Sequence, residues 1–216
     1  MAPAVHVTAA EQVSVVPVGP FGAAVAELVR SAGRAVTVVP DGDVRRAFRE
    51  PAGLVVLVSW RPCPARFAEA DDLAFALGRP WLPVLRDREV IAAGPLVSPP
   101  DGPCYQCYAR RALQHDRRFD ETETLNAAFD SGQAFGPAGF LPQEARVAAG
   151  LIAAISATTP AGAAARTTFS LVDRSVEVHD VIACPDCDRC LAGQDRLRES
   201  RQGFSEMIAA TRRPGT

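Results

Sequence analysis

The run GLVVLVSW, residues 53–60, constrains the fold of this chain more than any other segment. It is apolar at almost every position and rich in β-branched valine, as is typical of a strand covered on both faces of a sheet. Further strands are predicted at 12–19, 35–40 and 80–87, and segments with helical periodicity lie between them. Strands that alternate with helices predict an α/β fold, a Rossmann-like, doubly wound parallel sheet.

The second half of the chain is mainly helical in pattern. Its periodicity predicts helices over 105–115, 120–129 and 142–157, and then an alternating two-stranded ribbon over 167–182. A charged helix over about 193–210 is expected to close the chain. We therefore divide the chain into an N-terminal extension (1–11), a Rossmann-like domain (12–190), and a C-terminal helix and tail (191–216).

Composition excludes several classes of protein. The chain has 216 residues, enough for one well-buried domain, and its formal net charge is −2, so no nucleic-acid-binding surface is indicated. No apolar run is long enough for a membrane span, and the N-terminus lacks the pattern of a signal peptide, so a cytoplasmic protein is expected. All 23 basic residues are arginine, which excludes any mechanism that uses a lysine amine.

The segment VPVGPFG, residues 16–22, follows the first predicted strand, where a nucleotide-binding glycine loop would lie. A G-x-G-x-x-G motif would place glycines at 17, 19 and 22, but the chain has Pro17, Gly19 and Gly22. Asp41 follows the second strand, about where a ribose-binding acid would fall. The alternative is that Gly19 and Gly22 only allow close helix packing. We interpret Gly19, Gly22 and Asp41 as a vestigial nucleotide site.

Cysteines form two clusters, CYQC at 104–107 and CPDCDRC at 184–190. Two C-x-x-C pairs separated by a folded segment have the spacing of a structural tetrathiolate zinc site. The sequence predicts Cys104, Cys107, Cys184 and Cys187 as ligands. Cys190 forms a second C-x-x-C with Cys187, so the register Cys187–Cys190 stays open. Four thiolates leave no open coordination position, so such a site activates no water.

Other roles for the cysteines have less support. Disulfides are disfavoured in a cytoplasmic chain with an adequate core. Neither C-x-x-C follows the first strand of a βαβ unit, where a thioredoxin-like motif would lie. Cys63 lies between prolines after the third strand, so a nucleophile is conceivable there, although a loop or core role is more common. His6, His115 and His179 show no catalytic or metal-binding spacing.

Three segments carry a resemblance to a known family: GRPWLPVLRDREVIAAGPLVSPPDGPCYQCYARR (78–111), GPAGFLP (136–142) and the terminal CPDC (184–187). With the altered glycine loop, they resemble the ubiquitin-activating-enzyme-like (ThiF-type) adenylyltransferase superfamily. The closer similarity is to its degenerate branch, the cyclodehydratase-associated proteins of azole-containing ribosomal peptide (thiopeptide-type) biosynthesis.

The resemblance implies a non-catalytic adaptor of a YcaO-type, ATP-dependent cyclodehydratase that forms azolines on a precursor peptide. It implies structural zinc, no ATP on this chain, and a possible pairing of two copies through the sheet domain. Members usually carry an N-terminal leader-recognition domain, and the first strand near residue 12 leaves no room for one, so a separate protein is expected to bind the leader. Two alternatives stay open: an active ATP-dependent adenylyltransferase and an NAD(P)-binding oxidoreductase.

Overall fold

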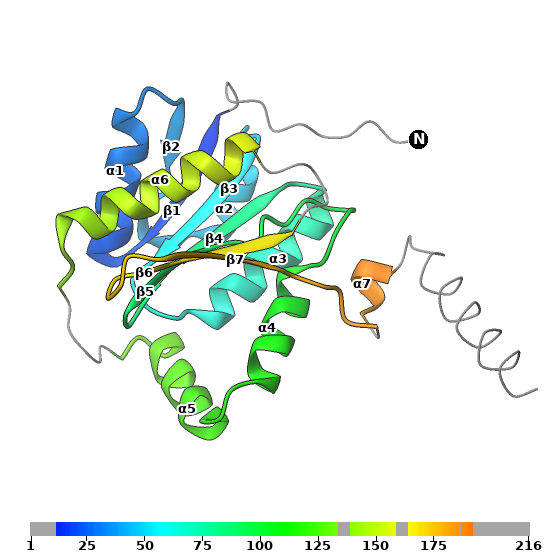
Figure 1. Ribbon diagram of the computed structural model, residues 1–216. Coiled ribbons are helices and arrows are strands. Elements are labelled where there is room, and N and C mark those ends of the chain that lie inside the picture. Colours follow the sequence, from blue (N-terminus) through cyan, green and yellow to red (C-terminus); the bar gives the residue numbers. More distant parts are fainter. Residues whose placement is uncertain (1–11, 134–138, 159–163, 186, 192–216) are drawn as a thin grey trace, which may run out of the picture.

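The computed structural model describes residues 12–133, 139–158, 164–185 and 187–191, and their centre is one mixed sheet between two layers of helices (Figure 1). The sheet has seven strands in the order β2-β1-β3-β4-β5-β6-β7. Their bounds are β1 (Val13–Val18), β2 (Val36–Val38), β3 (Leu54–Ser59), β4 (Trp81–Asp87), β5 (Val90–Ala93), β6 (Ala165–Ser170) and β7 (Val176–Asp180).

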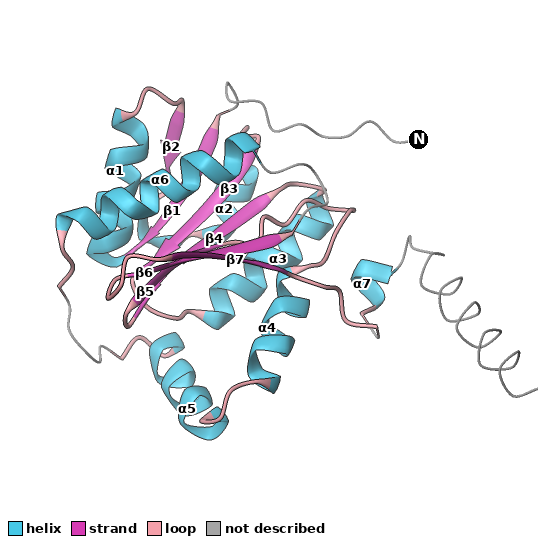
Figure 2. Ribbon diagram, in the orientation of Figure 1, coloured by secondary structure: helices cyan, strands magenta, loops and turns pink. Residues whose placement is uncertain are grey.

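The first four strands are parallel, and the last three continue the sheet in antiparallel pairs (Figure 2). The four strands predicted from the sequence are therefore confirmed, as is the ribbon formed by β6 and β7. β5 was not predicted. It is a four-residue strand that pairs with β4 through a tight turn, and its sequence VIAA is too short to give a periodic signal.

Helices cover both faces of the sheet, which confirms the doubly wound architecture. The described helices are α1 (Gly19–Ser31), α2 (Val44–Arg49), α3 (Pro64–Leu77), α4 (Tyr105–Gln114), α5 (Phe119–Asp130), α6 (Pro142–Thr158) and α7 (Asp188–Leu191), with a 3-10 turn η1 (Pro40–Gly42). Asp43 caps α2, because its Oδ1 accepts the Arg46 N–H at 2.9 Å. The predicted helix over 193–210 lies outside the described residues.

Two apolar clusters show how the layers are held together. On one face, Phe21 of α1 and Ile152 of α6 pack against the inward side chains of β1, β3, β4 and β5. On the other face, Phe48 of α2 and Phe67 of α3 pack against β3 and the fully buried Trp81. α4 and α7 extend from this second face near α3, whereas α5 lies below the strand ends (Figure 1).

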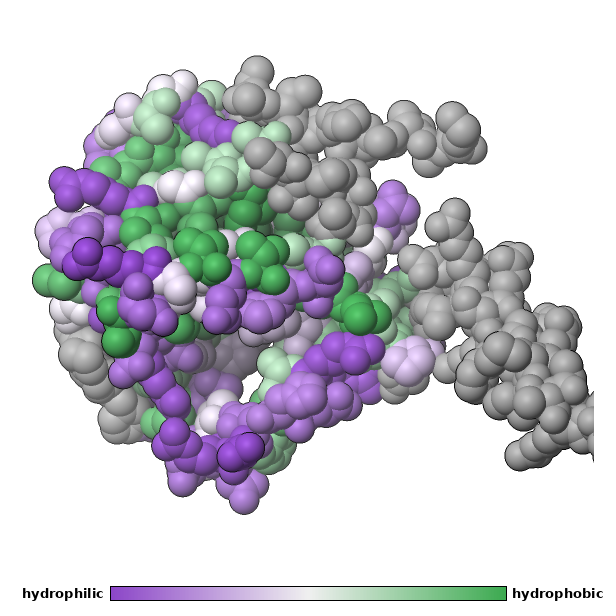
Figure 3. Space-filling model, viewed as in Figure 1, coloured by the Kyte–Doolittle hydropathy of each residue, from purple (hydrophilic) through white to green (hydrophobic). Residues whose placement is uncertain are grey.

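The β7 end of the sheet is less covered than its centre. All five residues of β7 are exposed, and apolar side chains gather across the middle of the face seen in Figure 3. Val176 and Val178 of β7 are exposed apolar side chains. In the described part of the chain, no helix is long and apolar enough to cross a membrane.

Candidate metal centre

The two cysteine clusters meet beside α3, at the beginnings of two helices. Cys104 is the residue before α4 and Cys107 lies in its first turn, while Cys187 directly precedes α7 and Cys190 lies within it. Both C-x-x-C segments thus turn from a loop into a helix, which directs each pair of sulfurs toward one point. The amino-terminal dipole of α4 also favours negative charge on the first pair.

The sulfur geometry fits a tetrahedral ion. The four Sγ atoms of Cys104, Cys107, Cys187 and Cys190 all lie within 4.8 Å of one another. The Cys104 Sγ is 3.7 Å from that of Cys107 and 3.8 Å from that of Cys187, and the Cys107 Sγ is 3.6 Å from that of Cys190. A tetrahedron with metal–sulfur bonds of about 2.3 Å has sulfur–sulfur edges of about 3.8 Å. The cluster can therefore hold a metal ion.

Burial and hydrogen bonding shift the pKa values of the cluster thiols in different directions. Burial raises the pKa of Cys107 to about 12. A hydrogen bond with the Cys190 thiol and burial together raise the pKa of Cys104. At Cys187 burial is outweighed by hydrogen bonds from the Cys190 N–H and neighbouring thiols, which lower its pKa. Thiolates this close together repel one another, so a bound cation is what would stabilise all four in ionised form.

Cys184, which the sequence placed among the ligands, is not part of the four-sulfur group; the structure brings together the other register, with Cys190 in its place. The Cys184 N–H donates to the Cys107 Sγ at 3.2 Å, and its own thiol lies 3.7 Å from the Cys107 carbonyl oxygen. The Cys104 N–H donates likewise to the Cys190 Sγ at 3.0 Å. Cys184 thus supports a ligand through its backbone, because such N–H donors stabilise a thiolate.

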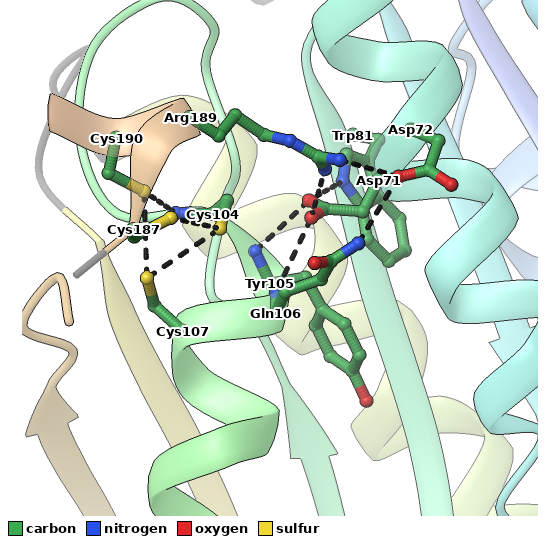
Figure 4. A network of polar contacts seen from close by, with 10 residues as sticks. All are labelled: Asp71, Asp72, Trp81, Cys104, Tyr105, Gln106, Cys107, Cys187, Arg189 and Cys190. Atoms are coloured by element: carbon green, nitrogen blue, oxygen red, sulfur yellow. Dashed lines mark hydrogen bonds and ion pairs between the residues drawn. The ribbon is translucent and has the colours of Figure 1, made fainter. Parts of the chain in front are cut away.

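A buried carboxylate fixes the same corner of the molecule (Figure 4). Asp71 of α3 is fully buried, and its oxygens accept the Tyr105 N–H at 3.0 Å, the Gln106 N–H at 3.4 Å and the Trp81 Nε1–H at 3.3 Å. Asp71 therefore caps the start of α4 from a neighbouring helix. Burial raises the pKa of Asp71, and these three donors act in the opposite direction.

Arg189 connects this carboxylate to the second cysteine cluster. Its guanidinium lies 2.9 Å from Asp71 and 2.6 Å from Asp72, and it lies over the Phe75 ring, 5.1 Å from the centroid. Arg111 of α4 adds a second tie, because it donates to the carbonyl oxygens of Ile182 and Ala183 at 2.8 and 3.0 Å. The segment around α7 thus contacts α3 and α4 through its cysteine sulfurs and through the hydrogen bonds and ion pairs of Arg189 and Arg111.

The altered glycine loop is occupied by a tryptophan. Gly19, the first residue of α1, has a φ of +74°, and a Cβ there would lie 2.4 Å from Cδ1 of the Trp60 indole. A Cβ on Gly22 would lie 2.6 Å from the Val58 carbonyl oxygen, so this glycine permits close approach of α1 to β3. Both glycines are engaged in packing. Asp41 lies in η1, directly after β2, and its side chain is outside the described part.

The sequence also singled out Cys63 and three histidines. Burial raises the pKa of Cys63 to about 11, so its thiol is a poor nucleophile at neutral pH. His6 lies outside the described residues. His115 and His179 line one groove beside α4 and β7, and His179 is 3.1 Å from Glu177 on the exposed strand.

Sequence reasoning missed Asp71, Asp72 and Arg189, because adjacent acids in a helix suggested a solvated surface. Helical spacing does contain the signal: Asp71 is four residues after Phe67 and three before Ala74, and both of these are buried. A carboxylate on the apolar face of a helix needs a hydrogen-bonding or charged partner when it is buried. The spacing of Asp71 therefore predicts a cationic side chain close to it.

Comparisons with known proteins agree with this architecture. No family model and no curated protein sequence matches the chain. Among solved structures, a heterocyclase in complex with substrate and cofactor is similar with a TM-score of 0.60 and 19% identity, over 86% of this chain and 25% of that one. The heterocyclase TruD is similar with a TM-score of 0.59 and 23% identity, over 89% of this chain and 28% of that one. MccB of E. coli with ATP is similar with a TM-score of 0.56 and 17% identity, over 83% of this chain and 66% of that one.

These likenesses confirm the fold that the sequence resemblance implied. The chain spans about a quarter of the length of the two heterocyclases, so it corresponds to one part of each. For this chain the likeness establishes the α/β architecture alone, and it does not extend to the ligands of those proteins.

Proposed function

We propose that this protein is a non-catalytic adaptor of a YcaO-type cyclodehydratase, which forms azolines on Cys, Ser or Thr of a ribosomal precursor peptide. The observation that carries the proposal is the combination of a four-sulfur group that can hold a metal ion with a glycine loop packed by Trp60. It occurs on a fold shared with heterocyclases. A chain of this kind is suited to hold partners together and poorly suited to perform the chemistry.

We further propose that the metal is zinc and that Cys104, Cys107, Cys187 and Cys190 bind it. Four thiolates in a tetrahedron are the usual donors of structural zinc, and they leave no position for water or substrate. The ion would stabilise the fold by joining α4 to α7, two segments that are distant in sequence. No catalytic step is assigned to it.

The partners follow from the same proposal. The cyclodehydratase supplies ATP chemistry, and the precursor peptide reaches it with the help of this chain. We expect a cytoplasmic complex, because a reducing compartment keeps cysteines available as metal-binding thiolates. A pairing of two copies through the sheet domain remains a proposal that a mass measurement in solution would test.

The direct test is reconstitution. The purified chain is added to a YcaO-type cyclodehydratase with a precursor peptide and MgATP, and loss of 18 Da per azoline is followed by mass spectrometry. We expect the two proteins to co-purify and the rate to rise on addition of the chain. Absence of both co-purification and rate change would contradict the adaptor function.

An active adenylyltransferase is the second candidate, because the fold is shared with an ATP-bound MccB structure. That activity requires pyrophosphate exchange dependent on a peptide substrate, and the contact between Trp60 and Gly19 argues against it. We expect no exchange above background. An oxidoreductase finds no specific support, and titration with NADH or NADPH would test it.

A further inference from the structure

A cleft of ≈ 570 Å³ lies at the carboxyl ends of β3 and β4, on the side of the sheet where α5 is located. Figure 3 shows the hollow between α5 and the strand ends, with hydrophilic side chains on its rim. Three connections and one helix form its walls. The lining includes Trp60, Arg61 and Pro62 after β3; Arg86, Asp87 and Arg88 at the end of β4; Asp116, Arg117 and Arg118 before α5; and Leu125 and Phe129 on α5.

The cleft carries an excess of positive charge. Five of its lining residues are arginine and two are aspartate, so their formal charges sum to +3. Arg86 is neutralised by the buried Glu144 at 3.0 Å, and Arg118 is 4.0 Å from Glu121. Within the described ranges, Arg61, Arg88 and Arg117 have no carboxylate oxygen within 4 Å. Three guanidinium groups from three connections thus line one cavity, beside the carboxylates of Asp87 and Asp116.

Arg61 is held in place before any ligand arrives. Its guanidinium carbon lies 5.0 Å from the Trp60 ring centroid and 4.9 Å from that of Phe129, so it is sandwiched between two aromatic rings. It also donates to the carbonyl oxygens of Gln133 and Phe129. An arginine ordered in this way loses little side-chain entropy when it binds an anion.

The apolar part of the lining indicates what kind of anion fits. Trp60, Pro62, Leu125 and Phe129 provide surfaces for aliphatic or aromatic side chains, beside guanidinium groups that pair with carboxylates. A polyphosphate would instead require converging backbone N–H groups at the start of α1, where Trp60 lies against Gly19. Charges that come from three separate connections suit carboxylates spaced along an extended chain.

We propose that this cleft binds an acidic, partly apolar peptide segment, with Arg61, Arg88 and Arg117 paired to its carboxylates and Trp60 and Leu125 against its apolar side chains. This inference rests on the proposed adaptor function and deepens it, because it makes the precursor peptide a direct ligand of this chain. The segment recognised would be one that carries at least two Asp or Glu residues among apolar ones.

The test measures peptide binding without any enzyme present. A fluorescein-labelled 12-residue peptide of alternating Glu and Leu is titrated with the full chain in 50 mM salt, and fluorescence anisotropy is followed. We expect saturable binding that weakens with salt, and at least about tenfold weaker binding to the double variant R88A/R117A. Both arginines are exposed, so the variant should fold, which its thermal melt will verify.

Matched controls make the outcome specific. R45A removes an exposed arginine of α2 that pairs with Glu69, outside the cleft, and should bind like wild type. The same peptide with Gln in place of Glu should lose binding. No saturation up to 1 mM, equal binding by R88A/R117A, or displacement of the peptide by micromolar ATP would each overturn the inference, the last because it would mark a nucleotide site.

The adaptor function and the cleft can fail separately. If the chain binds the acidic peptide but does not change cyclodehydratase turnover, the adaptor function fails and the cleft stands. If turnover rises equally with wild type and R88A/R117A while the peptide does not bind, the cleft fails and the adaptor function stands.

Discussion

The sulfur cluster and the arginine cleft differ in how their polar groups are satisfied. Around the sulfurs, side chains from α3, α4 and α7 turn toward one another, and the buried carboxylate of Asp71 meets four donors (Figure 4). In the cleft, Arg61, Arg88 and Arg117 surround empty volume. A closed network leaves no polar group for a ligand, whereas cationic side chains that line a solvent-accessible cavity remain available for binding. We therefore assign a structural role to the sulfur cluster and a ligand-binding role to the arginine cleft.

Substitution of a ligand should produce the largest effect, because it breaks the closed region at its centre. Apparent binding free energies of structural zinc are about 10–16 kcal/mol, so C107S should lose the metal and lower the melting temperature strongly. C184S is the matched control and should keep one metal per chain, since the Cys184 thiol is outside the four-sulfur group and its backbone N–H makes the contact with the Cys107 sulfur. Elemental analysis and thermal melts measure both. Metal loss in C184S with retention in C190S would reverse the ligand assignment.

Neutralisation of Asp71 should follow in size. D71A leaves Arg189 without its buried partner and removes the cap of α4, which should cost about 3–5 kcal/mol of unfolding free energy. D72A removes an exposed partner of the same arginine and should cost less than about 1 kcal/mol. Urea denaturation of the zinc-loaded proteins compares them. Equal losses would show that Asp71 does not hold this corner together.

The glycine loop allows a smaller and more discriminating test. In G19A the new residue has to adopt a positive φ, and its Cβ also overlaps the Trp60 indole. The free energy of unfolding should therefore fall by about 1–3 kcal/mol. G33A has a φ of +83° with nothing within 4 Å of an added Cβ, so it measures the backbone cost alone. The excess loss in G19A reports the packing of Trp60. If G19A were no worse than G33A, the loop would be open and a nucleotide could be accommodated.

The smallest effect concerns Cys63, which belongs to neither region. Burial raises its pKa to about 11, so roughly one thiol in a thousand is ionised at pH 8. Alkylation by iodoacetamide, mapped by mass spectrometry, should be negligible at pH 7.5 and should increase as the pH approaches 11 while the protein stays folded. Rapid alkylation at pH 7.5 would instead indicate an activated thiol.

The sequence predicted the frame of the sheet better than its details. A short apolar run rich in β-branched residues, such as 53–60, predicts a buried strand, but β5 is short and has no periodicity to reveal it. In CPDCDRC, two registers have identical C-x-x-C spacing, so only the position of α7 separates Cys184 from Cys190. The arginine cleft is formed by three connections that come together only in the folded chain, so no local sequence pattern predicts it. The division of the chain into domains remains a prediction.

X-ray absorption at the zinc edge of the purified protein tests the central claim most directly, because it counts and identifies the atoms bound to the metal. The account predicts one zinc per chain with four sulfurs at about 2.3 Å and no nitrogen or oxygen neighbour. A first shell with fewer than four sulfurs, or with a nitrogen or water oxygen, would mean that the site is open, and its purely structural role would be contradicted.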